Sequence, residues 1–146
     1  MGKCDLCLTR KPTMTLNRRL KYASLWTFTA LNYLYCDLLG VMDVNLLLQY
    51  QTGMVNDMEI SPEFLTAVAA YMQIPLANIF LPYVISNEKT LRWGQVASGS
   101  IATFVQAGSL LVGTPTPYYI LLSVVEISVT AYIAVDAFRW KPGIGM

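Results

Sequence analysis

The clearest feature of the hydrophobic pattern is an apolar run from Tyr118 to Phe138 that has a carboxylate, Glu126, near its middle. About 20 helical residues, each rising roughly 1.5 Å, cross a hydrocarbon core of about 30 Å, so this run is long enough to span a bilayer. A charged side chain at the bilayer centre costs about 3 kcal/mol on insertion scales, so Glu126 is not expected to face lipid. The pattern therefore predicts a membrane-spanning helix whose acid is shielded by other helices.

Three further apolar runs have the length of a spanning helix, at about residues 22–39, 62–85 and 92–112. The second starts with Ser-Pro-Glu, which supplies an N-cap, a first-turn proline and an acid at the positive end of the helix dipole. Pro75 removes a backbone hydrogen bond and should kink that helix. Residues 43–51 are too short to cross and predict a short helix in the interface. Short connections then predict an all-α, antiparallel four-helix transmembrane bundle.

The third run is rich in small residues at a spacing of four. Gly94, Ser98 and Ala102 form one stripe, and Gly99 and Thr103 form another. Small residues let helices approach closely within lipid. We expect close helix packing here, and a homo-oligomer is possible through this face.

All ten Lys and Arg residues fall on one side of the four-span arrangement: six precede the first span, and the others are Lys89, Arg92, Arg139 and Lys141. A three-span arrangement would place basic clusters on both sides and is disfavoured. The positive-inside rule then predicts an inner-membrane protein with both termini in the cytoplasm. Asp136 lies three residues before Arg139, so a local ion pair is expected there.

Composition supports this picture, with 55% hydrophobic residues, 13% charged residues and a mean hydropathy of +0.46. A chain of 146 residues predicts one domain, which we place at residues 21–142, between a basic tail at 1–20 and a short tail at 143–146. The basic tail is expected to rest on anionic lipid headgroups rather than on nucleic acid. No histidine is present, which excludes imidazole metal sites. Cys4 and Cys7 form a lone C-x-x-C, expected to be two reduced thiols; a redox pair or a zinc shared between copies are the alternatives.

The candidate site is a set of polar side chains near the middle of the bilayer. Counting along each span places Asn32, Gln73 and Glu126 at about 14–16 Å depth, with Gln106 nearer the outside and Asn78 one turn after Gln73. In one interpretation the amides hydrogen-bond a protonated Glu126 and hold the bundle together. In the other, the carboxyl binds or relays a proton or cation.

A second candidate is Asp37, near the outer end of the first span, with Tyr33 one turn before it. Asp37 is either a solvated acid at a helix end or, with Asp43 and Glu63, part of an acidic mouth that attracts cations. The sequence contains no P-loop, no G-x-S-x-G and no H-E-x-x-H motif. We therefore expect no cofactor, and we favour a non-enzymatic role.

Two stretches are distinctive together, Leu-Asn-Tyr-Leu-Tyr-Cys-Asp at 31–37 and Met-Gln-Ile-Pro-Leu-Ala at 72–77. With Val-Met-Asp at 41–43, Arg-Trp at 92–93, Pro-Tyr-Tyr-Ile at 117–120 and Glu-Ile at 126–127, they resemble a family of small four-span bacterial integral membrane proteins catalogued only as a domain of unknown function. The likeness covers about residues 20–142. It implies the four-span topology and no activity. It also implies an acid where this chain has Gln73, so a paired-carboxylate mechanism is not expected.

The leading functional hypothesis is binding or transmembrane passage of a small solute or cation, with a proton able to take part, through a polar core of Glu126, Gln73, Asn32 and Gln106. Four short helices enclose little volume, so a pathway could need more than one copy. The alternative is a non-catalytic scaffold or accessory subunit whose buried polar residues specify helix packing. A membrane enzyme acting on a lipid or quinone ranks third.

Overall fold

The structure is a computed structural model that describes residues 13–55 and 58–141 of the chain. Cys4 and Cys7 lie outside these residues. Residues 13–20, which we assigned to the basic tail, are helical and belong to the first helix. The elements in chain order are α1 (Thr13–Met42), α2 (Val44–Thr52), β1 (Met54–Val55), β2 (Met58–Glu59), α3 (Pro62–Val84), α4 (Glu88–Ser109) and α5 (Pro117–Arg139).

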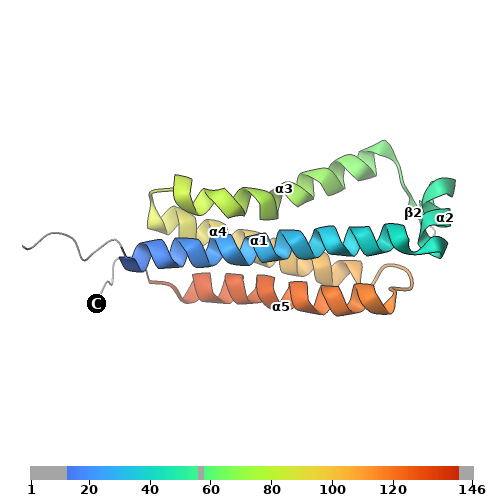
Figure 1. Ribbon diagram of the computed structural model, residues 1–146. Coiled ribbons are helices and arrows are strands. Elements are labelled where there is room, and N and C mark those ends of the chain that lie inside the picture. The colour runs from blue at the N-terminus through green and yellow to red at the C-terminus, as the bar shows by residue number, and fades with distance from the viewer. Residues whose placement is uncertain (1–12, 56–57, 142–146) are drawn as a thin grey trace, which may run out of the picture.

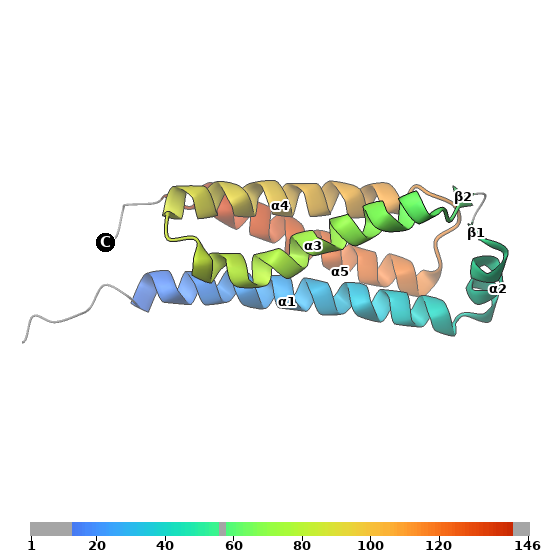
Figure 2. The ribbon, with the colours of Figure 1, turned by 90° about the horizontal axis from the view of Figure 1, so that it is seen from above.

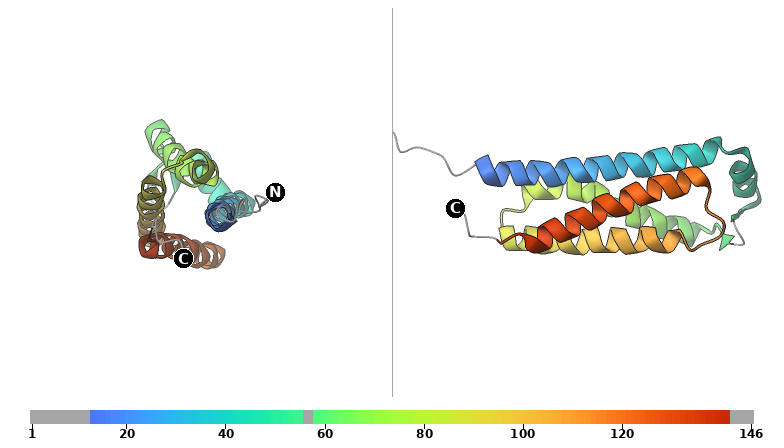
Figure 3. Two further views of the ribbon diagram at one scale, coloured as in Figure 1. Left: turned by 90° about the vertical axis from the view of Figure 1, so that its left-hand side faces the viewer. Right: turned by 90° about the horizontal axis from the view of Figure 1, so that it is seen from below.

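The chain is all-α apart from the short β1–β2 hairpin, as predicted, and its four long helices lie side by side (Figure 1). Contacts run from α1 to α3, from α3 to α4, from α4 to α5, and from α5 back to α1. Seen end-on, these helices surround a central axis in that order (Figure 3). Helices consecutive around this ring are antiparallel, so the start of α1 and the end of α5 lie at the same end of the bundle, while α2 and the hairpin lie at the other (Figure 1).

Length and composition mark two of the described helices, α3 and α5, as able to cross a membrane. A third span is reached if α1 and α2, which meet at an 86° bend, are counted as one. Helix α4 is not among them, because glutamines and small residues interrupt its apolar positions. Composition therefore supports two to three spans. Whether α4 is a fourth span depends on which of its residues face the other helices.

The helix starts follow the local sequence. Ser61 Oγ accepts a hydrogen bond of 3.2 Å from the Phe64 N–H, and Pro62 occupies the first turn, which confirms the predicted start of α3. Asp43 Oδ1 accepts from the N–H groups of Asn45 and Leu46 at 3.0 and 3.4 Å. Asp43 is therefore the N-cap of α2, a local role that the sequence analysis did not assign to it.

Helix α3 bends near its middle (Figure 2), where Pro75 lies within the helix. Proline has no N–H to offer the carbonyl one turn earlier, so the bend is the predicted consequence of its position. Pro82 also lies inside α3, two residues before the helix ends at Val84.

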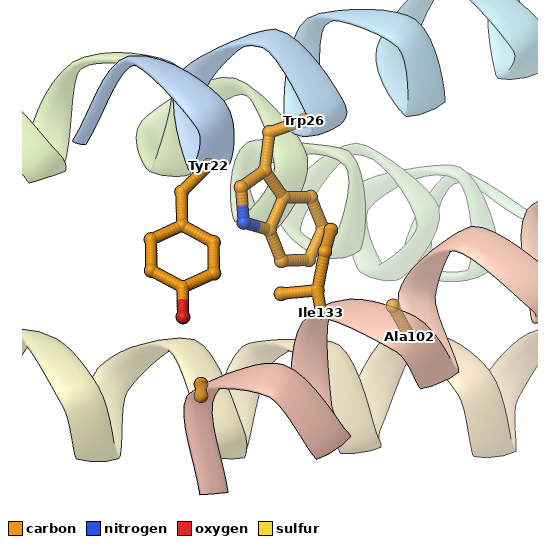
Figure 4. Packing of buried hydrophobic residues seen from close by; sticks show 5 residues of the cluster. Tyr22, Trp26, Ala102 and Ile133 are labelled. Atoms are coloured by element: carbon orange, nitrogen blue, oxygen red, sulfur yellow. The ribbon is translucent and has the colours of Figure 1, made fainter. Parts of the chain in front are cut away.

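The apolar core lies where α1, α4 and α5 meet. Tyr22 and Trp26 point from α1 toward Ile133 of α5, and Ala102 of α4 completes the contact (Figure 4). Gly99 lets α4 approach α5 closely, because a Cβ there would lie only 2.9 Å from the Thr130 carbonyl oxygen. The predicted close packing of the small residues on α4 is thus realised within one chain.

Candidate functional site

Glu126 is buried in the bundle, with 1% of its surface exposed, and faces α1 from α5. Its Oε1 accepts a hydrogen bond of 2.8 Å from Nδ2 of Asn32, which also donates to the Leu122 carbonyl at 3.2 Å. Its Oε2 is buried and has no hydrogen-bond partner in the part of the chain that the structure describes. The predicted pairing of Asn32 and Glu126 is therefore present. Oε2 is the carboxyl oxygen that has no described hydrogen-bond partner.

The chemistry of Glu126 Oε2 follows from its burial without a hydrogen-bond partner. An ionised oxygen without a partner is costly in a low-dielectric interior, because nothing replaces the hydration that it loses. The oxygen therefore favours a proton or a bound cation. Because Asn32 supplies a donor, Oε1 is fixed as an acceptor, and the proton or cation belongs at Oε2.

Two tyrosines pair across the interface of α1 and α3. The hydroxyls of Tyr33 on α1 and Tyr71 on α3 are 2.9 Å apart. Tyr33 was a sequence candidate, whereas Tyr71 was missed. The missed signal is a stripe at intervals of four, three and four residues on α3, formed by Tyr71, Pro75, Asn78 and Pro82, which all turn inward.

The same stripe explains an error in the sequence interpretation. Gln73 is exposed, and its Nε2 reaches only the Ala69 carbonyl of its own helix, at 3.5 Å. Two residues correspond to about 200° around a helix of 3.6 residues per turn, so Gln73 faces away from Tyr71 and Pro75 on either side of it. Depth alone suggested that Gln73 joins the core, and the helix phase places it outside.

Gln106 lies close to the Glu126 site, at the interface of α4 and α5. Its Nε2 donates to Ser123 Oγ at 2.8 Å, and Ser123 precedes Glu126 by three residues on α5. Nearby, the Tyr119 hydroxyl donates to Ser109 Oγ at 2.6 Å, and Ser109 Oγ donates to the Gln106 carbonyl at 2.8 Å. Gln106 is thus within one helical turn of the site while bonded to another partner.

Asn78 belongs to a second polar cluster rather than to the Glu126 site. Trp26 Nε1 donates to Gln95 Oε1 at 2.6 Å, and Gln95 Nε2 donates to Asn78 Oδ1 at 2.8 Å. Asn78 Nδ2 donates to Ser98 Oγ at 3.0 Å and to the Ile74 carbonyl at 2.8 Å. This cluster joins α1, α3 and α4, and each amide group in it has a partner.

Sequence reasoning missed the Trp26–Gln95 contact. A signal was available, because Gln95, Gly99, Ala102 and Gln106 form a buried stripe on α4 at helical intervals. Two glutamines three turns apart on one face predict two polar layers in the core. The partner Trp26 comes from a helix on the opposite side of the ring, and no local pattern encodes that pairing.

At the end of the bundle that holds the basic residues, side chains of different helices bond to one another. Asp136 Oδ2 accepts from Lys21 Nζ and from the Tyr22 hydroxyl, both at 2.8 Å. The prediction that Asp136 pairs with Arg139 is therefore wrong in its partner: Lys21 of the neighbouring helix α1 reaches the carboxylate instead.

Two arginines cap the ends of two helices. Arg19 donates to the carbonyls of Pro82, Ile85 (2.8 Å) and Ser86 (3.4 Å) at the end of α3. Arg92 donates to the carbonyls of Ala137 (3.2 Å) and Phe138 (2.8 Å) at the end of α5. The last carbonyls of a helix have no partner within it and carry a partial negative charge, so these guanidinium groups satisfy both needs.

Asp37 lies on α1 toward the other end, where it is exposed and lines a groove between α1 and α3 together with Tyr33. Glu63 is exposed in the first turn of α3. Of the three acids proposed for a cation-attracting mouth, Asp43 is thus used as a cap, and Asp37 is the one placed in a groove.

A family model described as "Family of unknown function (DUF6326)" matches residues 13–144. The match covers most of the 146 residues and confirms the resemblance to a family of unknown function. No curated protein and no solved structure matches the chain.

Proposed function

We propose that this chain, which belongs to the family of unknown function DUF6326, is a four-span membrane protein that binds a small solute or cation, or lets it pass, at Glu126, with a proton taking part. The observation that carries the proposal is the buried Oε2 of Glu126, which lacks a partner among the described residues while Oε1 is held by Asn32.

The outward-facing side chains support a position within a bilayer. Large apolar residues are widely exposed, including Phe104 at 76% and Leu111 at 87%. Each square ångström of apolar surface left in water costs roughly 25 cal/mol, whereas lipid imposes no such cost.

The packing of α4 supports it as the fourth span. Its glutamines, Gln95 and Gln106, are buried, whereas Ile101, Phe104 and Val105 are exposed. The polar residues that lower its average hydropathy therefore face the other helices and not the lipid. With α4 included, the seven described Lys and Arg residues gather at one end of the bundle, which favours cytoplasmic termini at an inner membrane.

The geometry around Glu126 suits a carboxyl group that changes its own charge state. A buried carboxyl with one oxygen fixed and the other without a protein partner can hold a proton or a cation at that second oxygen. Asn32 fixes Oε1, and Oε2 has no hydrogen-bond partner among the described residues.

Proton flux into proteoliposomes tests the proposal. Vesicles containing the purified chain and an internal pH dye are given a membrane potential, with and without a gradient of monovalent cations. We expect flux above that of empty vesicles, and its loss in Glu126→Gln, which keeps the side-chain shape and removes the exchangeable charge. Glu59→Gln, in the exposed hairpin, is the matched control. Equal flux in the wild type and Glu126→Gln, or no flux above empty vesicles, contradicts the proposal.

A second candidate function is a non-catalytic scaffold or accessory subunit. The cluster of Trp26, Gln95, Asn78 and Ser98 favours it, because those side chains satisfy one another within the core. A scaffold requires polar layers that specify packing and no open carboxyl oxygen. Absence of proton flux together with intact folding of Glu126→Gln favours this alternative.

A further inference from the structure

A groove of about 380 Å³ runs along the outside of the bundle between α1 and α3. Its walls are mainly apolar and include Leu31, Leu34, Met72, Leu76 and Ile79, with Asp37 as its carboxylate. From Thr27 to Asp37 the lining of α1 extends over ten residues, which corresponds to about 15 Å along the helix. The groove is therefore long enough to hold an extended chain or a rod-shaped ligand, and it has an acid toward one end.

The groove follows from the sequence of α3. Pro75 lines it at the bend of α3 and cannot donate a backbone hydrogen bond (Figure 2). Tyr33 contributes to the wall while its hydroxyl is bonded to Tyr71. The walls thus offer apolar contact and few free donors, and the Asp37 carboxylate is an acceptor.

Among the described residues, Asp37 has no counter-ion. In the described ranges it makes no hydrogen bond or ion pair, and the titratable groups that it influences are Cys36, Tyr50 and Glu126, none of which is a cation. The sequence has no Lys or Arg between Lys21 and Lys89. Lys21 is on the same helix but 16 residues away, about 24 Å along its axis.

We infer that this groove binds an amphiphilic organic cation, with an apolar chain or rod along α1 and α3 and an ammonium-type group at Asp37. A phospholipid with an anionic headgroup is disfavoured, because its phosphate would approach an unneutralised carboxylate. A neutral acyl chain fills the apolar walls and leaves Asp37 unpaired. An ammonium group satisfies both the walls and the acid with one charge-assisted contact.

This inference adds a second site to the proposed function and rests on it only for the position of the chain in a membrane. The two remain separable because different acids carry them. Asp37 holds the bound cation in the groove, whereas Glu126 exchanges a proton in the core. Asp37 and Glu126 repel each other when both are ionised, so a cation at Asp37 would also lower the cost of charge at Glu126.

Binding of a charged fluorophore tests the inference. The probe is diphenylhexatriene with a trimethylammonium group at one end, and the neutral parent compound is its control. Both are added to nanodiscs containing the full chain, and energy transfer from tryptophan is measured with an excess of non-fluorescent alkyltrimethylammonium as competitor. The competitor separates saturable binding from partition into the lipid.

We expect saturable binding of the cationic probe near one per chain, and at least tenfold weaker binding of the neutral parent. Asp37→Asn should weaken binding of the cation at least tenfold, whereas Glu59→Gln should retain it. Loss of cation binding in Asp37→Asn, with proton flux lost in Glu126→Gln but not in Asp37→Asn, separates the two sites. Equal saturable binding of both probes, or no effect of Asp37→Asn, overturns the inference and assigns the groove to lipid chains.

Discussion

Asn32 and Glu126 join α1 to α5 through a single hydrogen bond of 2.8 Å, although 94 residues separate them in the sequence. The bond links a half-buried amide to a buried carboxyl whose other oxygen has no described partner. It therefore combines a structural role, which is to hold two helices together, with a chemical one, which is to orient the open oxygen.

The bond predicts an energetic coupling between these two residues. Asn32→Ala removes the donor to a buried carboxyl and should lower the free energy of unfolding by about 1–3 kcal/mol. The same change in a Glu126→Leu background should cost less, because no acid remains to be satisfied. A double-mutant cycle measured by unfolding in mixed detergent micelles checks this, and strictly additive losses would contradict the bond.

Gly99 and Gly94 give a matched pair on α4. A Cβ at Gly99 would meet the Thr130 carbonyl at 2.9 Å and the Ala134 nitrogen at 3.0 Å, whereas at Gly94 no described atom lies within 4 Å. Gly99→Ala should force α4 and α5 apart and lower the free energy of unfolding by roughly 1–3 kcal/mol. Gly94→Ala should be neutral or slightly stabilising, because alanine favours a helix. Equal effects on the denaturation midpoint would show that the helices do not approach here.

Two glutamines, Gln95 and Gln73, should respond differently to substitution by leucine. Gln95→Leu leaves the Trp26 N–H and the Asn78 carbonyl oxygen without partners, and each loss costs about 1–3 kcal/mol. Gln73→Leu alters an exposed position and should leave the free energy of unfolding nearly unchanged. Tryptophan fluorescence provides a second readout, since Trp26 loses a hydrogen bond only in Gln95→Leu. Equal destabilisation by both would place Gln73 in the core.

The orientation predicts which loops are reached from outside the cell. In a chain with its cysteines replaced by serine, Glu59→Cys lies at the α2 end and Lys89→Cys at the end that holds the basic residues. A membrane-impermeant maleimide should label Glu59→Cys in intact cells and Lys89→Cys only after lysis. Labelling of both in intact cells, or of Lys89→Cys alone, would exclude the four-span arrangement with cytoplasmic termini.

Local chemistry made much of the fold predictable. Ser61 and Pro62 predict the start of α3, because the N-cap hydroxyl and the first-turn proline both act within one turn. Glu126 was placed inside the bundle because an acid in an apolar run is too costly to face lipid, and it is buried. Each prediction depended on the cost of one residue in its own segment.

The errors arose where a partner comes from another segment or where helix phase decides. Asp136 was matched to Arg139 on its own helix, but Lys21 reaches it from α1. Gln73 was placed by depth alone, and its angle around α3 puts it outside. The contact of Trp26 with Gln95 depends on how four helices are arranged around an axis, which no single periodic pattern specifies.

A crystal structure grown in a lipidic mesophase, at a resolution that shows ordered water and ions, tests the central claim most directly. We predict density for a water or cation within hydrogen-bonding distance of Glu126 Oε2, with Asn32 still bonded to Oε1. A Glu126 side chain turned toward lipid, or an Oε2 bonded to another protein group in a dry core, would contradict it.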